Sequence, residues 1–374
     1  MLEDSDKAMH VGQLNFPSWD AFQSAFSDIF DRGFYSNHGP LTAELDRALA
    51  AYLNVKHAIC VTNGTIALML VLRSLDLKGN VITPSFTFPA TVQSIVWAGL
   101  TPVFCDVDPE THVLDARRVE PLVTDSTAAI LGVHLWGRPC DPHGLTDLAQ
   151  RRGLKLVFDA AHATGCRFKG VPIGGLGHAE IFSFHATKIL NAAEGGCITT
   201  NDDLLAAKLR AARSFHDMGF VTSGLLRMNA KMSEAQAAMA LIGLRNIDAL
   251  IVDNRERYLH YRRLLADVPG LRVIDYGDDG QSNYQYVVAQ IDESVFGTSR
   301  DRLMNELWNR NIYVRRYFWP ATHLCPPFDD TPWSLPVTEQ LCETLIQFPS
   351  GQGITESDID KVCRMVRDIR ERAI

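Results

Sequence analysis

The stretch AICVTNGTIALMLVLRSL, residues 58–75, joins a strand pattern to a helix pattern. Its first four residues are all apolar, which indicates a strand that is buried on both faces. After Asn63-Gly64-Thr65 the chain keeps the apolar periodicity of a helix over 64–75. A buried strand that leads directly into a helix is the repeating unit of a parallel α/β sheet.

The same unit recurs through the first 200 residues. A second helical pattern spans 88–98, and further apolar runs predict strands at 80–83, 102–105, 129–134, 155–159, 180–184 and 196–200. Because these runs are apolar throughout and alternate with helices, we predict an α/β fold with a mostly parallel central sheet. Ligands of such sheets bind beyond the carboxyl ends of the strands.

The texture of the sequence changes near residue 235. One long helical pattern over 234–268 leads to a strand at 284–291, a helix around 299–309, a strand near 312–316 and a last helix at about 355–372. A chain of 374 residues exceeds the usual size of a single core. We therefore predict a large domain over 1–250, which includes an N-terminal substrate loop, and a small α+β domain over 251–374.

Composition excludes several classes of protein. The chain is 46% apolar and 21% charged with a net charge of -8, which is typical of a soluble globular protein and gives no sign of nucleic acid as a partner. No apolar run approaches the roughly 20 residues that span a bilayer, and the N-terminus lacks the pattern of a secretory signal. The eight cysteines form no C-x-x-C pair. They favour buried free thiols in a reducing cytoplasm over disulfides or a metal site.

Two charged residues follow neighbouring predicted strands. Asp159 ends the run 155–159, where a buried carboxylate needs a cation, although aspartate is also common at helix caps and turns. Lys188 follows the next strand and lies between the apolar run IFSF and the small residues AAEGG. A lysine among such neighbours is desolvated, so its pKa falls and its amine becomes a nucleophile toward carbonyl groups.

The remaining polar candidates surround this pair. Gly64 and Thr65 open a helix whose N-terminus is suited to an anion such as phosphate, although N-G-T is also a common turn. Ser183 adds a hydroxyl that is suited to the same phosphate. Phe88 is a candidate for stacking on a flat ring or for ordinary core packing, and His162 is ambiguous in the same way.

These parts together match the needs of one cofactor. Pyridoxal 5′-phosphate requires a lysine amine for its aldehyde, a carboxylate for its pyridine nitrogen and a seat for its phosphate. The protonated pyridine nitrogen also explains how a buried Asp159 stays ionised.

At this point the sequence resembles the DegT/DnrJ/EryC1/StrS family of sugar aminotransferases, which adopt the type I fold of aspartate aminotransferase. The resemblance covers nearly the whole chain in matching order. It rests on the segments 37–45, 63–68, 83–111, 133–141, 157–174, 182–196 and 227–240.

The resemblance implies a three-layer fold and specific roles for residues. Lys188 would form a Schiff base with the cofactor and later carry the proton, and Asp159 would pair with the pyridine nitrogen. The resemblance further implies that Gly64, Thr65 and Ser183 hold the phosphate, that Phe88 stacks on the ring, that His162 lies near the ring hydroxyl, and that Asn229 reaches the phosphate of a neighbouring subunit. A homodimer with shared active sites follows from this last role.

The same resemblance implies the substrates. The segment 182–196 together with RRYFWP at 315–320 is most similar to members that transfer the amino group of L-glutamate to a nucleotide-linked 4-keto-6-deoxyhexose, giving a 4-amino-4,6-dideoxyhexose. Arg315, Arg316 and Arg227 are candidates for the diphosphate, with ordinary surface arginines as the alternative. The residues implied at the substrate are Tyr35, Asn37, His38, His134 and Arg316.

Other functions stay open at this point. The ketone is alternatively a 3-keto sugar or a cyclitol ketone. Some members carry histidine in place of the lysine and dehydrate sugars, which the presence of Lys188 disfavours. A regulator that binds the cofactor without turnover is the remaining alternative.

Overall fold

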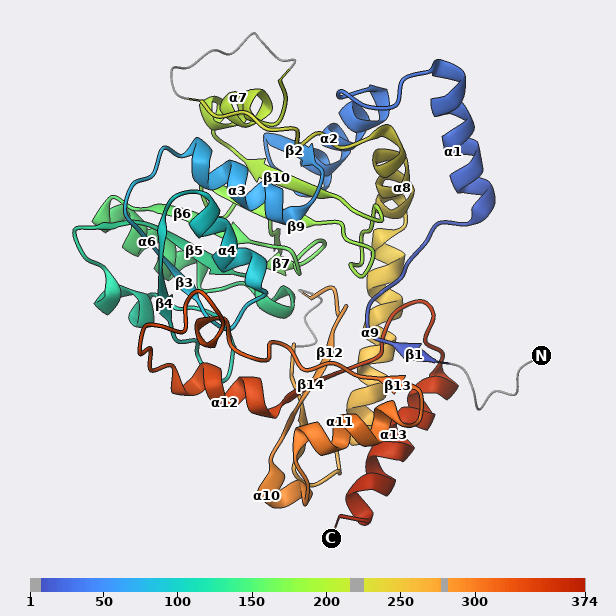
Figure 1. Ribbon diagram of the computed structural model, residues 1–374. Helices are drawn as coiled ribbons and strands as arrows, with labels where there is room; N and C mark the ends of the chain where they lie inside the picture. Colours follow the sequence, from blue (N-terminus) through green and yellow to red (C-terminus); the bar gives the residue numbers. More distant parts are fainter. Residues whose placement is uncertain (1–7, 216–224, 277–281, 374) are drawn as a thin grey trace.

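A seven-stranded sheet forms the centre of the larger part of the molecule (Figure 1). The computed structural model describes residues 8–215, 225–276 and 282–373. The strand order is β2-β10-β9-β6-β5-β3-β4; six strands run in one direction, and β10 is antiparallel to both of its neighbours. The predicted mostly parallel sheet is therefore confirmed. Its strands are β2 (His57–Val61), β3 (Asn80–Pro84), β4 (Thr101–Cys105), β5 (Thr127–Val133), β6 (Lys155–Asp159), β9 (Ala179–Ser183) and β10 (Gly196–Thr200).

Helices cover both faces of this sheet, which produces three layers. Along β2, Ile59 and Val61 face the cluster that contains α3, whereas Ala58 and Cys60 face the cluster that contains α2. Because successive residues of a strand point to opposite faces, a strand covered on both sides is apolar throughout. The helices on the first face are α3 (Gly64–Ser74), α4 (Pro89–Trp97) and α7 (Asp203–Ala212), and those on the second are α2 (Pro40–Tyr52), α6 (Pro142–Arg152) and α8 (Glu234–Arg245).

The predicted single helix over 234–268 is wrong. The segment forms α8 and α9 (Ile247–Leu265), which meet at a 63° bend. The break lies at Asn246, whose φ and ψ of −111° and 2° are not helical and whose side chain donates a hydrogen bond to the carbonyl of Ile242. An amide side chain that bonds nearby backbone competes with the helical hydrogen bonds, so the second helix starts in a new direction.

A smaller antiparallel sheet lies in the C-terminal part of the chain. Its order is β11 (Leu271–Val273), β12 (Val287–Ile291) and β14 (Leu345–Phe348). Figure 1 shows α9 running from the large sheet to this smaller one. The predicted strand over 284–291 thus begins three residues later, and the strand near 312–316 is reduced to β13 (Ile312–Tyr313), which pairs with β1 (Met9–His10).

The remaining elements are short or peripheral. Helix α1 packs against α8, and α13 packs against α9. The loop predicted at 276–283 falls mostly outside the described residues. These elements are α1 (Trp19–Arg32), α5 (Ala116–Val119), α10 (Glu293–Phe296), α11 (Arg300–Trp308), α12 (Pro336–Thr344), α13 (Glu356–Glu371), β7 (Arg167–Phe168), β8 (Val171–Pro172) and the 3₁₀ turns Glu120–Leu122, Leu135–Gly137 and Thr322–Leu324.

Within the described ranges, no single helix is long and apolar enough to cross a membrane; the bent pair α8 and α9 passes that test only by length and composition. The eight cysteines are unpaired, and seven of them are buried, as the sequence predicts.

Candidate active site

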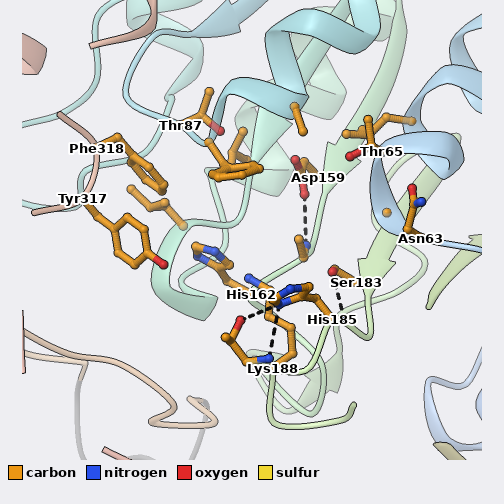
Figure 2. Close-up of a pocket in the computed structure, with 18 of the residues that line it drawn as sticks. Asn63, Thr65, Thr87, Asp159, His162, Ser183, His185, Lys188, Tyr317 and Phe318 are labelled. Atoms are coloured by element: carbon orange, nitrogen blue, oxygen red, sulfur yellow. Dashed lines mark hydrogen bonds between the residues drawn. The ribbon is translucent and has the colours of Figure 1, made fainter. Parts of the chain in front are cut away.

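A cavity of about 480 Å³ lies at the carboxyl ends of the central strands. Its wall combines the last residues of β6 and β9 with the first turn of α3 and with the segment 315–318 of the C-terminal part. Figure 2 shows Thr65 and Ser183 on one side of this pocket and Tyr317 and Phe318 on the opposite side. Both regions of the chain are therefore needed to enclose it.

Asp159 places a buried carboxylate in the wall of the cavity. The residue ends β6, and its two oxygens accept hydrogen bonds from the Thr91 hydroxyl at 2.8 Å and the Ala161 N–H at 3.0 Å. Burial raises the pKa of Asp159, while these two bonds and the charge of Lys188 oppose the rise. The carboxylate is thus oriented, and a cation in the cavity would complete its set of partners.

Lys188 lies in the same cavity, on a loop whose two sides are joined by backbone hydrogen bonds. Phe184 N–H donates to the carbonyl of Gly195 at 2.8 Å, and Ala186 N–H donates to that of Ala193 at 2.9 Å. These bonds hold the loop between β9 and β10. Burial lowers the pKa of Lys188 to about 8, and Asp159 opposes this shift. Near neutral pH the amine therefore exchanges its proton readily, as a nucleophile or a general base requires.

The first turn of α3 forms one end of the cavity. The N–H groups in the first turn of a helix have no partner within the helix. Asn63 caps α3 by accepting from the N–H of Ile66 at 2.9 Å, and the N–H groups of Gly64 and Thr65 are left without a helical partner. An added Cβ at Gly64 would lie 3.3 Å from the Cβ of Ser183, which shows how closely β9 approaches this turn. Backbone donors, a hydroxyl and the helix dipole together form a seat for an anion.

Phe88 and His162 line the cavity as well. Phe88 is 57% exposed, so core packing does not explain it. The ring of His162 is buried and stacks on the ring of Trp136, with 5.8 Å between the ring centres. Its Nδ1 accepts a hydrogen bond from the backbone N–H of Trp136 at 3.3 Å. Burial first, and the charge of Lys188 second, lower the pKa of His162 well below its usual range, so the imidazole is neutral with its proton on Nε2.

Six residues implied by the resemblance do not line this cavity in the described part of the chain: Tyr35, Asn37, His38, Asn229, His134 and Arg316. His134 is fully buried beneath it, stacked on Phe158 at 4.5 Å. The Arg316 guanidinium donates to Asp301 at 2.9 Å and lies 3.7 Å from the ring centre of Trp319, whereas Arg315 lines the cavity.

The other four occupy separate surroundings. Tyr35 is half exposed, and His38 accepts a hydrogen bond from Arg213 through Nδ1 at 2.9 Å. Asn37 has a left-handed φ of 62° in the same N-terminal loop. Asn229 accepts from the amine of Lys231. The roles implied for all six residues stay predictions.

Sequence reasoning missed several residues of the cavity and its surroundings. Thr91 was detectable, since it lies in the first turn of the helix that follows β3. Tyr286, whose hydroxyl accepts from the Lys188 amine at 3.0 Å, gives no signal because it reads as an ordinary strand residue. Tyr317 and Phe318 belong to the segment 315–320 that carries part of the resemblance, but no pattern singles out these two residues, and apart from Arg315 the other lining residues lie far away in the sequence.

Comparisons with known proteins identify the family of this chain. Residues 19–367 match the model of the DegT/DnrJ/EryC1/StrS aminotransferase family. The dTDP-4-amino-4,6-dideoxy-D-glucose transaminase of Shigella dysenteriae is 36% identical over 84% of this chain and 86% of its own, and the GDP-perosamine synthase of Caulobacter vibrioides is 35% identical over 90% and 91%.

A solved structure agrees with these relatives. DesI, crystallised in the presence of its TDP-sugar product, superposes with a TM-score of 0.95 and 42% identity over 98% of this chain and 94% of its own. The Helicobacter pylori aminotransferase PseC, at 22% identity and a TM-score of 0.90 over 98% of this chain and all of its own, shares the fold. The chain belongs to the DegT/DnrJ/EryC1/StrS aminotransferase family.

Proposed function

We propose that this aminotransferase uses pyridoxal 5′-phosphate to move the amino group of L-glutamate to the ketone of a nucleotide-linked keto sugar. The sugar we propose is a dTDP-4-keto-6-deoxyhexose, and the product a 4-amino-4,6-dideoxyhexose. The observation that carries the proposal is the cavity itself, which holds Lys188, Asp159 and the open N-terminus of α3 in one wall.

Three features of the cavity support this cofactor. The amine of Lys188 is available to a carbonyl because burial keeps its pKa at about 8. The oriented carboxylate of Asp159 is suited to a protonated ring nitrogen. The N–H groups of Gly64 and Thr65 and the Ser183 hydroxyl would hold the phosphate, while the exposed face of Phe88 is available to a flat ring.

The residues would divide the work as follows. When bound, the cofactor supplies an electron sink for the carbon that bears the transferred amine. Lys188 takes the proton from the α-carbon of L-glutamate in the first half of the reaction and returns a proton to the sugar carbon in the second. Asp159 keeps its partner nitrogen protonated throughout. His162 is neutral and adds no charge to the site, and its Nε2–H would donate a hydrogen bond to the ring hydroxyl of the cofactor.

The choice of substrate rests on the relatives and on one arginine. The Shigella relative bears the name of a dTDP-4-amino-4,6-dideoxy-D-glucose transaminase, and DesI was crystallised with a TDP-sugar product. Arg315 lines the cavity and is exposed to it, so its guanidinium is available to a diphosphate or a carboxylate. Both substrates of the proposed reaction are anionic and bind in turn.

Absorbance spectroscopy tests the reaction directly. We expect the purified protein to show the yellow band of bound pyridoxal phosphate, to lose it with L-glutamate and to regain it when the right keto sugar is added. Offering 4-keto sugars, 3-keto sugars and cyclitol ketones one at a time identifies the acceptor. A protein that stays colourless with added pyridoxal phosphate would contradict the proposed cofactor, and a yellow protein that ignores glutamate would contradict the donor.

We also infer a homodimer in which Asn229 of one subunit serves the cofactor phosphate of the other. Two observations support this inference. Asn229 lies outside the cavity lining of its own chain in the described residues. Helix α1 exposes an aromatic face that a partner would cover, formed by Trp19, Phe26 and Phe30.

A hybrid dimer tests the shared site. Asn229→Ala should weaken cofactor binding, and Lys188→Ala should abolish turnover. A dimer of one chain of each variant contains one cavity with both Lys188 and a partner's Asn229. We therefore expect the hybrid to regain about half of the activity of the native dimer, whereas a hybrid no more active than the Asn229→Ala dimer would place Asn229 in its own subunit's site.

We infer a reducing compartment, the cytoplasm, for this reaction. The support is the set of unpaired cysteines, seven of which are buried. Thiol titration of the freshly lysed, denatured protein should give eight free thiols, and a smaller number would contradict this inference.

A further inference from the structure

Tyr286 brings the C-terminal part of the chain into contact with the amine of Lys188. The residue comes directly before β12, and its hydroxyl accepts a hydrogen bond from the Lys188 Nζ at 3.0 Å. The amine lies 5.7 Å from the centre of the ring. The contact therefore joins the proposed reactive nitrogen to a residue 98 positions away in the sequence.

The position of this hydroxyl is fixed by packing. Only 6% of Tyr286 is exposed, and its ring lies 4.5 Å from that of His162 and 5.3 Å, edge to face, from that of Trp136. Aromatic neighbours on two sides leave the ring little freedom to turn away. The oxygen consequently stays at one place beside the Lys188 amine when the lysine side chain moves.

A second hydrogen bond joins the same two segments. The N–H of Ile189, directly after Lys188, donates to Oε1 of Gln285, directly before Tyr286, at 3.1 Å. Gln285 in turn donates through Nε2 to the carbonyl of His162 at 2.6 Å. Backbone and side chain are thus aligned together, so the approach of the hydroxyl to the amine is a feature of the fold rather than of one rotamer.

A phenol suits an amine that changes its charge. Among the described residues, the titratable groups that interact with the Lys188 amine are Asp159, His162 and Tyr286, and the cavity is also lined by His185, Glu194, Arg315 and Tyr317. Burial raises the pKa of Tyr286 well above its usual range, so the hydroxyl stays neutral. A neutral hydroxyl accepts from an ammonium and donates to a free amine, whereas a carboxylate in its place would hold the lysine charged.

From this geometry we propose that Tyr286 is a positioning residue that holds the amine of Lys188 while that amine is free, between its release and its return. The proposal rests on the proposed function, in which Lys188 is freed in the first half of the reaction, moves a proton in each half and is attached again at the end of the second. A free lysine side chain has four rotatable bonds and samples many rotamers. Tyr286 keeps it in the one direction from which it reaches the substrate.

The test replaces the hydroxyl and keeps the ring. In the apoenzyme, acetylation of Lys188 across a range of pH, read by mass spectrometry of its peptide, measures the pKa of this amine alone. Because a hydrogen bond to an ammonium is stronger than one to an amine, we expect Tyr286→Phe to lower that pKa by about one unit. At pH 7, labelling of Lys188 should then rise about fivefold.

A matched control lines the same cavity. Tyr317 carries a hydroxyl that accepts from Arg315 at 3.1 Å, and within the described part of the chain this hydroxyl makes no hydrogen bond with Lys188. Tyr317→Phe should leave the titration of Lys188 as in the native chain. Both variants should keep the near-ultraviolet circular dichroism and a Tm within about 3 °C of the native value, which separates the loss of the hydroxyl from misfolding.

Single-turnover kinetics of the loaded enzyme supply the second readout. With L-glutamate, Tyr286→Phe should slow the disappearance of the yellow band about tenfold at saturation, while the glutamate concentration for half-maximal rate stays the same. An unchanged pKa of Lys188, or an unchanged single-turnover rate, would overturn the role of Tyr286.

A separate experiment distinguishes this failure from failure of the proposed function. Borohydride reduction of the native protein with pyridoxal phosphate should attach the cofactor to Lys188. If another residue or none is labelled, the proposed function itself is wrong. If Lys188 is labelled and Tyr286→Phe behaves as native, only the inference about Tyr286 falls.

Discussion

The cavity has two walls of different origin. The sheet wall consists of Gly64, Asp159, Ser183 and Lys188, which lie at or just beyond the ends of neighbouring strands. The C-terminal wall consists of residues of the segment 315–318, whose backbone is tied to β14 through hydrogen bonds between Arg315 and Gln347. Tyr286, from the same part of the chain, contacts Lys188 next to this wall.

This difference separates two tasks. The register of the large sheet fixes the sheet wall, so the groups proposed for the chemistry keep constant positions relative to one another. The C-terminal wall depends on how the smaller sheet packs, and its segment 315–318 can vary without moving the groups of the sheet wall. Changes to the sheet wall should therefore abolish the reaction, and changes to the C-terminal wall should alter substrate affinity or the position of the lysine.

The largest effect is expected from Lys188→Ala. Without the amine neither the attachment of the cofactor nor the proton transfer takes place, so single-turnover rates with L-glutamate should fall by at least about 10⁴-fold. Lys169→Ala, an exposed lysine on the β7–β8 hairpin, is the matched control and should keep the native rate. A Lys188→Ala enzyme that turns over would remove the basis of the proposed function.

Asp159→Asn should give the next largest loss. The amide keeps the shape and can still accept from Thr91, but it cannot hold a proton on a ring nitrogen, so the rate should fall about 10²- to 10³-fold. Thr91→Val separates orientation from charge, because it removes the 2.8 Å bond and leaves the carboxylate, and it should cost only about threefold to tenfold. Equal losses in both variants would show that orientation alone matters.

The site residues that could be predicted from the sequence belong to the sheet wall, and those that could not belong to the C-terminal part. The strand runs and the order of Asp159 and Lys188 were enough to predict that both residues reach one edge of the sheet, because parallel strands end together. Nothing in the sequence relates Tyr286 to Lys188, since their contact depends on the packing of a second sheet. The break at Asn246 was missed because the apolar periodicity continues on both sides of it.

The two adjacent arginines, Arg315 and Arg316, show this limit of sequence-based prediction at a single position. The resemblance implies Arg316 at the substrate, and Arg315 is a candidate for the diphosphate; of the two, Arg315 lines the cavity. Neighbouring residues of an extended segment point to opposite sides, so a register error of one residue exchanges the two roles. The register is set by the bonds to Gln347, which no local pattern reveals.

The pH dependence of cofactor uptake tests the pKa of Lys188 in the sheet wall, and we expect a smaller effect than in Lys188→Ala and Asp159→Asn. Because burial lowers the pKa of Lys188 from 10.5 to about 8, the neutral amine forms as pH rises through 8. Uptake of pyridoxal phosphate by the apoenzyme should rise about tenfold per pH unit below 7 and level off above about 8 to 9. Rates that still rise toward pH 10 would show an ordinary, solvated lysine, and the Lys188→Ala apoenzyme supplies the background.

The smallest effects are expected at the C-terminal wall, from Arg315→Gln and Arg316→Gln. Arg315 faces the cavity but is exposed, so solvent screens its charge, and its loss should raise the KM for the nucleotide sugar about tenfold with kcat little changed. Arg316 instead bonds Asp301 of α11, and its loss should change KM by less than about twofold.

The pair is informative because the two residues are adjacent and carry the same charge. A long-range effect of net charge would act on both variants equally and would weaken with added salt. A direct contact with the diphosphate acts only through the side chain that reaches the cavity. A tenfold change at Arg315 with almost none at Arg316 therefore locates the substrate on the C-terminal wall, whereas equal changes would reduce that wall to a general attraction for anions.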